Sequence, residues 1–306
     1  MKILITGGCG YIGSALYRHL KSAGHHVQSV DWTNQAAPDG IDNLNRNYRS
    51  LEIFDLSCDV LVHLAGHSSV AACEGDPWGS TENNLAGFLP FLRQLSFLPN
   101  PPIVLWASSG SVLSDVHSLY DEQKRALEAL VPRLYPRSVG LRFASVCGVS
   151  PNQRDDLILN AMVKSAVTRG YLNVANPFIS KPVLGLKDLC RRVTAMVESD
   201  GDMEWPVESI SSFTCTPELS SWAVKAATGC EIRRNPSPRA YDFQMPMTHG
   251  ATETLESIVA DLVEHYTAKA VECRNIWPGK GYDAPPAIRI VNPAPIEPDT
   301  EDRHRV

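Results

Sequence analysis

The 306-residue sequence contains no long apolar run, no CxxC pair of cysteines and no excess of basic residues. No stretch approaches the roughly 20 apolar residues that cross a bilayer. The opening segment has neither the long apolar core nor the cleavage site of a secretory signal. We therefore expect a soluble, cytoplasmic protein that does not enter a membrane.

Charge and cysteine usage exclude further classes of protein. Twenty-eight basic residues stand against 34 acidic ones, which gives a net charge of −6. This balance provides no basic surface for nucleic acid or anionic lipid. The eight cysteines are scattered and have no histidine-rich neighbourhood, so we expect reduced thiols and no metal site.

What the chain does contain is an alternation of strand and helix patterns. Hydrophobic residues make up 43% of the sequence, enough for a substantial core. Short β-branched runs predict strands, and apolar residues at helical spacing predict helices between them. This alternation is typical of an α/β fold with a Rossmann-like, doubly wound parallel sheet. The predicted strands span 2–6, 26–30, 58–65, 103–107 and 138–143, and the clearest helices span 11–23 and 119–134.

The pattern loosens beyond residue 150. We expect a smaller, mixed α/β substrate-binding domain over residues 151–275. The last segment, 276–306, is rich in proline and ends in charged residues, which predicts an extended or disordered tail. Helical patterns in the second half span 157–169, 186–198, 217–228 and 251–269.

A glycine-rich turn joins the first predicted strand to the first predicted helix. The segment TGGCGYIG places three glycines at intervals of three residues. Glycines here permit a sharp turn, close approach of a pyrophosphate and close helix packing, while the helix N-terminus offers free N–H groups. We predict that residues 1–150 form a dinucleotide-binding domain. The cofactor-binding residues that we predict in this turn are Gly7, Gly10, Tyr11, Ile12 and Gly13.

An acidic residue follows the second predicted strand. Asp31 lies 18 residues beyond Gly13, where a carboxylate accepts hydrogen bonds from both ribose hydroxyls and repels a 2′-phosphate. Trp32, Thr33 and Asn34 follow it, and none of them is a cation. The sequence therefore predicts NAD, in preference to NADP, as the cofactor.

Motifs along the chain resemble those of the extended short-chain dehydrogenases/reductases, specifically the NAD-dependent nucleotide-sugar epimerase/dehydratase group. The resemblance covers roughly residues 1–270 and implies a nucleoside-diphosphate-sugar substrate and a homodimer. The motifs that carry it are TGGCGYIG at 6–13, HLAG at 63–66, NLAG at 84–87, ASSGSV at 107–112, YDEQK at 120–124 and LRFASVCG at 141–148.

The resemblance implies roles for individual residues. Ser109, Tyr120 and Lys124 match the catalytic serine and the YxxxK pair. The third-strand signature and the YxxxK pair would line the cofactor through Leu64, Ala65, Gly66, Tyr120 and Lys124. The substrate side would consist of Ser109, Ser111, Ser145, Lys181 and Arg239, with the two cations near the diphosphate.

The spacing of Tyr120 and Lys124 supports this chemistry independently. Residues four apart on a helix share one face. A nearby ammonium is expected to lower the tyrosine pKa from its reference value near 10. The tyrosine can then take a proton from a sugar hydroxyl while hydride leaves for the nicotinamide, and Ser109 can hold the same oxygen.

Departures from the family pattern leave a second class of function open. Ser109 and Tyr120 are only 11 residues apart, and Ser145 and Cys147 stand where the family has asparagine and tyrosine. A catalytically degenerate, NAD-binding regulator or scaffold is therefore the competing hypothesis.

The reaction expected within the group depends on the strand end at 108–112. The sequence SSGSV has no carboxylate there, so the acid–base pair that 4,6-dehydration requires is missing. We therefore expect 4-epimerisation through a transient keto sugar, with hydride taken up and returned by bound NAD. The alternative enzyme is a nucleotide-sugar keto-reductase or dehydrogenase with an exchanging nicotinamide.

Overall fold

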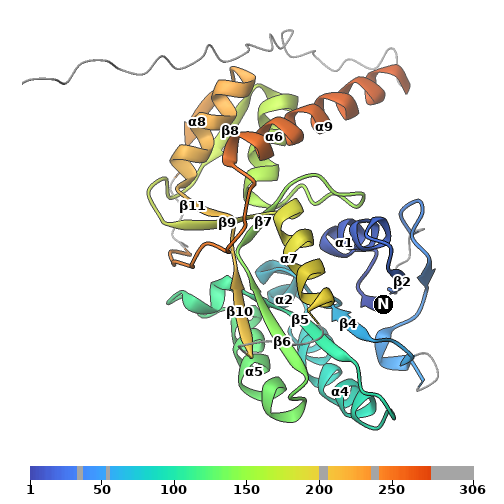
Figure 1. Cartoon of the computed structure of the whole chain (residues 1–306). Helices are drawn as coiled ribbons and strands as arrows, with labels where there is room; N and C mark the ends of the chain where they lie inside the picture. Colours follow the sequence, from blue (N-terminus) through green and yellow to red (C-terminus); the bar gives the residue numbers. More distant parts are fainter. Residues whose placement is uncertain (33–36, 53–55, 200–205, 236–240, 277–306) are drawn as a thin grey trace, which may run out of the picture.

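The computed structural model describes residues 1–32, 37–52, 56–199, 206–235 and 241–276. Within them a large parallel sheet carries helices on both faces, and a smaller unit of short strands and helices lies beyond one end of it (Figure 1). No helix in these ranges has both the length and the apolarity needed to cross a bilayer.

Seven parallel strands form the large sheet in the order β10-β6-β5-β4-β1-β2-β3. The chain builds one half outward from β1 to β3, then returns to the centre at β4 and builds the other half. This reversal is the hallmark of a doubly wound sheet and confirms the predicted Rossmann-like α/β class. The strands are β1 (Lys2–Thr6), β2 (His26–Val30), β3 (Asn43–Leu44), β4 (Val60–His63), β5 (Ile103–Ser109), β6 (Ser138–Phe143) and β10 (Val207–Ile210).

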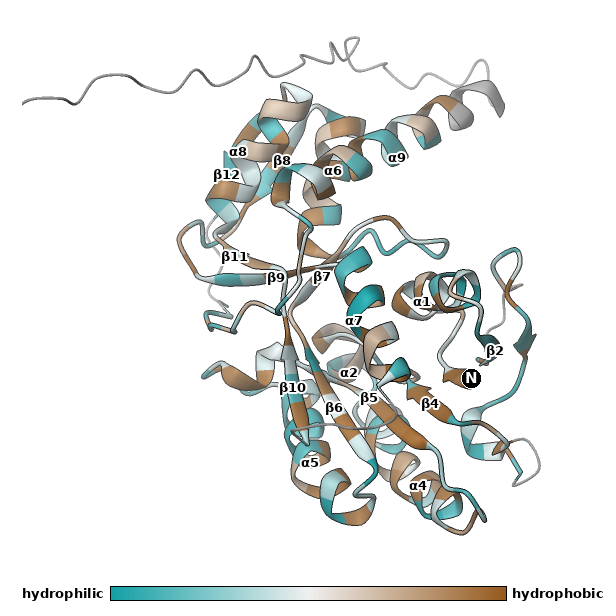
Figure 2. Cartoon of the chain, in the orientation of Figure 1, coloured by the Kyte–Doolittle hydropathy of each residue, from teal (hydrophilic) through white to brown (hydrophobic). Residues whose placement is uncertain are grey.

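Each face of the large sheet has its own apolar core because alternate strand residues point to opposite sides. Ile3 and Ile5 pack with two helices on one face, whereas Leu4 packs with two helices on the other. The central strands are therefore apolar on both sides, and β4 and β5 are largely brown in Figure 2. The helices are α1 (Tyr11–Ser22) and α7 (Leu186–Glu198) on the first face, and α4 (Phe88–Ser96) and α5 (Leu119–Leu134) on the second.

Shorter helical segments fill the connections of the large unit. They are turns at Tyr48–Ser50 and Gly110–Leu113, the helices α2 (Val70–Gly75) and α3 (Pro77–Thr81), and a π-type turn at Glu82–Ala86.

The smaller unit has a separate core formed mainly by three helices and short strands. Figure 1 shows these helices gathered at the top of the molecule. The strands are β7 (Ser145–Cys147), β9 (Lys181–Gly185) and β11 (Phe213–Cys215) in one sheet, and β8 (Tyr171–Val174) and β12 (Glu231–Arg234) in another. The helices are α6 (Ile158–Arg169), α8 (Pro217–Thr228) and α9 (Leu255–Ile276).

The chain passes between the two units more often than the sequence pattern indicates. Helix α7 and strand β10 follow β7 to β9 in the chain, yet α7 packs on the large sheet and β10 pairs with β6. The predicted helix at 251–269 begins later and extends to Ile276. The predicted tail lies outside the described residues from 277 onward.

Candidate active site

A pocket of about 610 Å³ lies at the carboxyl edge of the large sheet, within the size range of small-molecule sites. In a parallel sheet all strand ends of one polarity meet at this edge, so residues distant in sequence come together. The pocket-lining residues that the sequence predicted are Gly7, Gly10, Tyr11, Ile12, Gly13, Asp31, Leu64, Ala65, Gly66, Ser109, Ser111, Tyr120, Lys124, Ser145 and Lys181.

The glycine turn after β1 leaves no room for side chains. Gly7 has a φ of +74°, and a Cβ added to it would lie 2.7 Å from the backbone nitrogen of Ala65. A Cβ on Gly13 would lie 2.1 Å from the carbonyl oxygen of Gly7. Helix α1 begins after Gly10 without a capping side chain, so the helix N-terminus faces the pocket with unsatisfied N–H groups. The glycine turn and the N-terminus of α1 together fit a dinucleotide pyrophosphate.

Asp31 lies at the pocket edge directly after β2. Its Oδ2 accepts a hydrogen bond from the Cys9 amide at 3.0 Å, which fixes the carboxylate against the glycine turn. Burial raises the Asp31 pKa, while backbone N–H donors lower it in part. The placement fits the predicted contact with the ribose diol of NAD.

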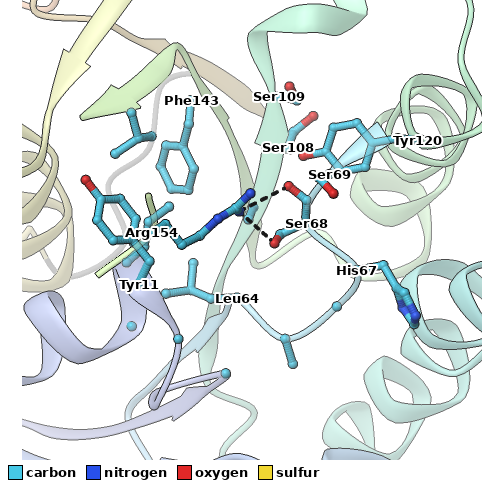
Figure 3. A pocket seen from close by; sticks show the side chains of 18 of the residues that line it. Tyr11, Leu64, His67, Ser68, Ser69, Ser108, Ser109, Tyr120, Phe143 and Arg154 are labelled. Carbon is cyan, nitrogen blue, oxygen red and sulfur yellow. Dashed lines mark hydrogen bonds between the residues drawn. The ribbon is translucent and has the colours of Figure 1, made fainter. Parts of the chain in front are cut away.

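Tyr120 and Lys124 lie on one face of α5 and both line the pocket. Lys124 Nζ donates to the Ala107 carbonyl at 2.7 Å and lies 5.6 Å from the centroid of the Tyr120 ring. Figure 3 shows Tyr120 beside Ser108 and Ser109, which come from the end of β5. The short connection between Ser109 and Tyr120 therefore still brings the predicted serine and tyrosine together.

The expected lowering of the Tyr120 pKa is wrong. Burial raises that pKa to about 12, and the nearby Ser109 hydroxyl offsets only part of the rise. Burial also lowers the pKa of Lys124, to about 8. Desolvation disfavours the charged form of each group, and it is the largest cause of both shifts.

The smaller unit contributes one wall of the pocket through Ser145 of β7, Lys181 of β9 and Tyr241. Lys181 Nζ lies 5.6 Å from the ring centroids of both Tyr241 and Phe243. Burial lowers the Lys181 pKa. The other predicted cation, Arg239, lies outside the described residues.

Arg154 is a pocket residue that the sequence analysis missed. Its guanidinium donates to Ser68 Oγ at 2.9 Å and forms an ion pair with Asp156 at 2.6 Å. Figure 3 shows Arg154 reaching between Tyr11 and the serines. Its positive charge lowers the Tyr120 pKa in part. Arg154 lies in an irregular segment, where no periodicity marks the direction of a side chain.

The histidine at the end of β4 has a structural role. His63 is buried and stacks on Phe88 with ring centroids 3.8 Å apart. Its Nδ1 lies 2.7 Å from Thr6 Oγ1, and burial lowers its pKa to about 3. A neutral, buried imidazole packs in the core, and His63 is not among the predicted catalytic residues.

The sheet, the glycine turn, the carboxylate after β2 and the Ser–Tyr–Lys group are those of a dinucleotide-binding protein of the extended short-chain dehydrogenase/reductase class. Residues 3–177 match the model of the NAD dependent epimerase/dehydratase family. The chain belongs to that family, and its cofactor is NAD.

Two curated relatives illustrate the similarity in sequence. Protein CapI of Staphylococcus aureus is 31% identical over 212 residues, which cover 58% of this chain and 63% of that protein. UDP-glucose 4-epimerase of Yersinia enterocolitica is 28% identical over 131 residues, which cover 38% of this chain and 39% of that protein. The matched part of the chain thus spans about three fifths of CapI and two fifths of the epimerase.

Solved structures share the fold over most of the chain. The NAD-dependent NDP-hexosamine 5,6-dehydratase TunA has a TM-score of 0.76 and 21% identity, covering 87% of this chain and 98% of that chain. UDP-glucuronic acid 4-epimerase from Bacillus cereus, in complex with UDP-glucuronic acid and NAD, has a TM-score of 0.73 and 18% identity, covering 88% and 100%. At these identities the likeness concerns the fold alone.

Proposed function

We propose that the protein is an NAD-dependent enzyme that epimerises a nucleoside-diphosphate sugar at C4 through a transient keto sugar. The observation that carries the proposal is the distribution of acids and bases around the pocket. Among the described residues that line it, Asp31 is the sole carboxylate, and it lies beside the glycine turn, away from Ser109 and Tyr120. The reacting end is therefore equipped for proton and hydride transfer at a carbinol.

Each residue of the reacting end has a defined part in this proposal. NAD, when bound, accepts a hydride from the sugar carbinol and returns it. Tyr120 removes the proton of the C4 hydroxyl and later restores it. Ser109 holds the same oxygen, and Lys124, fixed by the Ala107 carbonyl, supplies positive charge beside Tyr120. Release, rotation and rebinding of the keto group expose its other face to the returning hydride.

The substrate diphosphate requires local positive charge in a chain of net charge −6. Lys181 projects into the pocket from β9 and supplies one cation. Ser111 and Ser145 add hydroxyl groups on the same side, and Arg239 stays a prediction for a second cation.

Dehydration is the main competing reaction because the family includes dehydratases. Elimination requires an acid and a base near C5 and C6 of the sugar, in addition to the tyrosine. No described carboxylate lines the pocket near Tyr120. Relatives named as 4-epimerases, including the UDP-glucose enzyme of Yersinia enterocolitica, support epimerisation.

The test uses the purified NAD-loaded protein with UDP-glucose and UDP-glucuronate in D₂O, followed by NMR. Epimerisation at C4 produces the 4-epimer without deuterium on carbon, because the hydride returns from the cofactor. Dehydration would instead place solvent deuterium on the sugar carbons and remove a hydroxyl. Accumulation of NADH with net oxidation would indicate a dehydrogenase, and NAD binding with no reaction of any probe would indicate a regulator.

Replacing Asp31 by alanine is expected to weaken NAD binding by about 10-fold to 100-fold, because charge-assisted hydrogen bonds to the ribose are lost. Affinity for NADP should change less, since the same substitution removes repulsion of the 2′-phosphate. Calorimetric titration with both cofactors measures this, and Asp39→Ala, an exposed aspartate outside the pocket, is the matched control. Equal affinity of the unaltered protein for NAD and NADP would contradict the assignment of Asp31.

We also propose a homodimer through α5 and the segment from 84 to 95. Leu130 and Leu134 on α5 are 39% and 57% exposed, which leaves apolar surface available to a second copy. Light scattering at micromolar concentration should show a dimer, and Leu130→Glu with Leu134→Glu should yield a monomer. A monomeric unaltered protein under these conditions would disprove the dimer.

A further inference from the structure

Lys181 differs from two other cations of the pocket in what surrounds its charge. Lys124 Nζ donates to a backbone carbonyl, and the Arg154 guanidinium is paired with the Asp156 carboxylate. Within the part of the chain that the structure describes, the Lys181 ammonium pairs with no carboxylate and instead lies over two aromatic rings. Its positive charge is therefore available to an anion that enters the pocket.

The two rings belong to Tyr241 and Phe243. Lys181 Nζ lies 5.6 Å from the centroid of each ring, within the roughly 6 Å at which a ring face attracts a cation. An ammonium that is removed from water loses hydration, and the electron-rich ring faces replace part of it. The two rings thus stabilise the charge and restrict the flexible four-carbon side chain that carries it.

The segment that carries the rings is anchored on both sides. Asp242 Oδ1 accepts a hydrogen bond from the Ser180 amide at 3.0 Å, which ties the segment to the residue before Lys181. Further along, Ser211 Oγ donates to the Pro246 carbonyl at 2.7 Å. The rings therefore keep a defined place beside the start of β9.

Phe243 also contacts the turn that follows β5. A Cβ added to Gly110 would lie 2.9 Å from Phe243 Cε2, so the ring packs directly on this glycine. Ser109 and Ser111, the two neighbours of Gly110, line the pocket, whereas Phe243 is 8% exposed and does not line it. One ring therefore spans the distance between the serines at the reacting end and the ammonium of Lys181.

We propose that Tyr241 and Phe243 are positioning residues that hold the Lys181 ammonium where the diphosphate of the substrate binds. This inference rests on the proposed function, which places a nucleoside-diphosphate sugar in the pocket. Phe243 sets how far the ammonium lies from Ser109 and Ser111, and that separation has to match the distance from the diphosphate to C4 of the sugar.

The benefit to binding comes from preorganisation. An ammonium that is already restricted loses less conformational entropy when it binds an anion than a mobile one does. Removing one ring releases the Lys181 side chain but leaves its charge in the pocket. The affinity for a diphosphate should then fall, while the affinity for an uncharged nucleoside should not.

The test measures binding to the NAD-loaded protein by calorimetric titration and needs no turnover. UDP, dTDP, CDP and GDP are the diphosphate probes, and the nucleoside of the tightest binder is the uncharged probe. We expect Lys181→Met to weaken diphosphate binding by about 10-fold to 100-fold, and Phe243→Leu to weaken it by about 3-fold to 10-fold. Affinity for the nucleoside should change by less than about twofold in both variants.

A double variant separates positioning from structural support. If Phe243 acts through the ammonium, Phe243→Leu should cause no further loss of diphosphate affinity in a protein that already carries Lys181→Met. A loss of the same size in both backgrounds would show that Phe243 only supports the fold of the pocket. The Tm and the NAD affinity of each variant are measured in parallel.

Tyr241 provides a second route to the same answer. Tyr241→Phe keeps the ring and should bind the diphosphate as the unaltered protein does, whereas Tyr241→Leu should weaken binding by about 3-fold to 10-fold. Trp222→Leu is the matched control, because the Lys225 ammonium lies 5.3 Å from the Trp222 ring centroid in the same kind of contact, on α8 and outside the pocket. This control should leave diphosphate affinity unchanged.

The outcomes distinguish this inference from the proposed function. Unchanged diphosphate affinity in Phe243→Leu, or in Tyr241→Leu where the first variant does not fold, would overturn the inference while the function stands. Failure of every diphosphate probe to bind would overturn the proposed function and the inference with it. The expected affinities without turnover of UDP-glucose or UDP-glucuronate would contradict the proposed epimerisation of these sugars and leave the positioning of Lys181 in place.

Discussion

The Tyr120→Phe variant is expected to lose sugar turnover by a factor of about 10² to 10⁴, the usual contribution of a positioned proton-transfer group. Only one hydroxyl is removed, and the ring keeps its place beside Ser108 and Ser109 (Figure 3). Folding and NAD affinity should therefore be unchanged. Initial rates with the probe sugar that the unaltered protein converts, together with calorimetric titration of NAD, measure both quantities.

Tyr171→Phe is the matched control for this substitution. Tyr171 lies on β8 of the smaller unit, outside the pocket, and its ring faces the Arg233 guanidinium at 3.7 Å. Removing its hydroxyl should leave kcat unaltered. Full turnover by Tyr120→Phe would show that another group transfers the proton.

The Gly13→Val variant is expected to lose NAD affinity by about 100-fold or more and to unfold at a lower temperature. A Cβ at position 13 would lie 2.1 Å from the Gly7 carbonyl and 2.7 Å from the Gly8 Cα, and both are backbone atoms that cannot rotate away. The first turn of α1 must therefore move off the glycine turn, which displaces the N–H groups that face the phosphates. Overpacking of this kind costs about 1 to 3 kcal/mol or more.

Gly75→Ala provides the control for a glycine at a helix end. A Cβ there meets no atom within 4 Å, so Tm and NAD affinity should stay within experimental error of the unaltered protein. Calorimetry and a thermal melt of both variants complete the comparison. Tight NAD binding by Gly13→Val would contradict the prediction that the glycine turn binds the pyrophosphate of NAD.

Strong local signals predicted most of the large unit. The strands at Lys2–Thr6 and Ser138–Phe143 and the helix at Leu119–Leu134 have the expected bounds, because apolar periodicity and capping residues act within a few positions. Strand β10 had no such signal. It has only four residues, two of them polar, and it is a strand because β6 offers it a free edge.

The smaller unit was predicted less completely for a similar reason. Its strands have three to five residues each, which is too short for an alternating pattern to stand out. The return of α7 to the large sheet depends on its packing against α1. A sequence shows the apolar face of such a helix, but it does not show which of two neighbouring cores receives that face.

The sequence by itself determined the glycine turn, the acid after β2 and the Tyr120–Lys124 pair, because each depends on the order of residues within one strand–helix junction or one helix turn. Only the tertiary structure decided the electrostatics of the site. Burial raises the pKa of Tyr120 and lowers that of Lys124, and folding places Arg154 in the same pocket. Desolvation and contacts between distant segments exist only after the chain has packed, so no local spacing could reveal them.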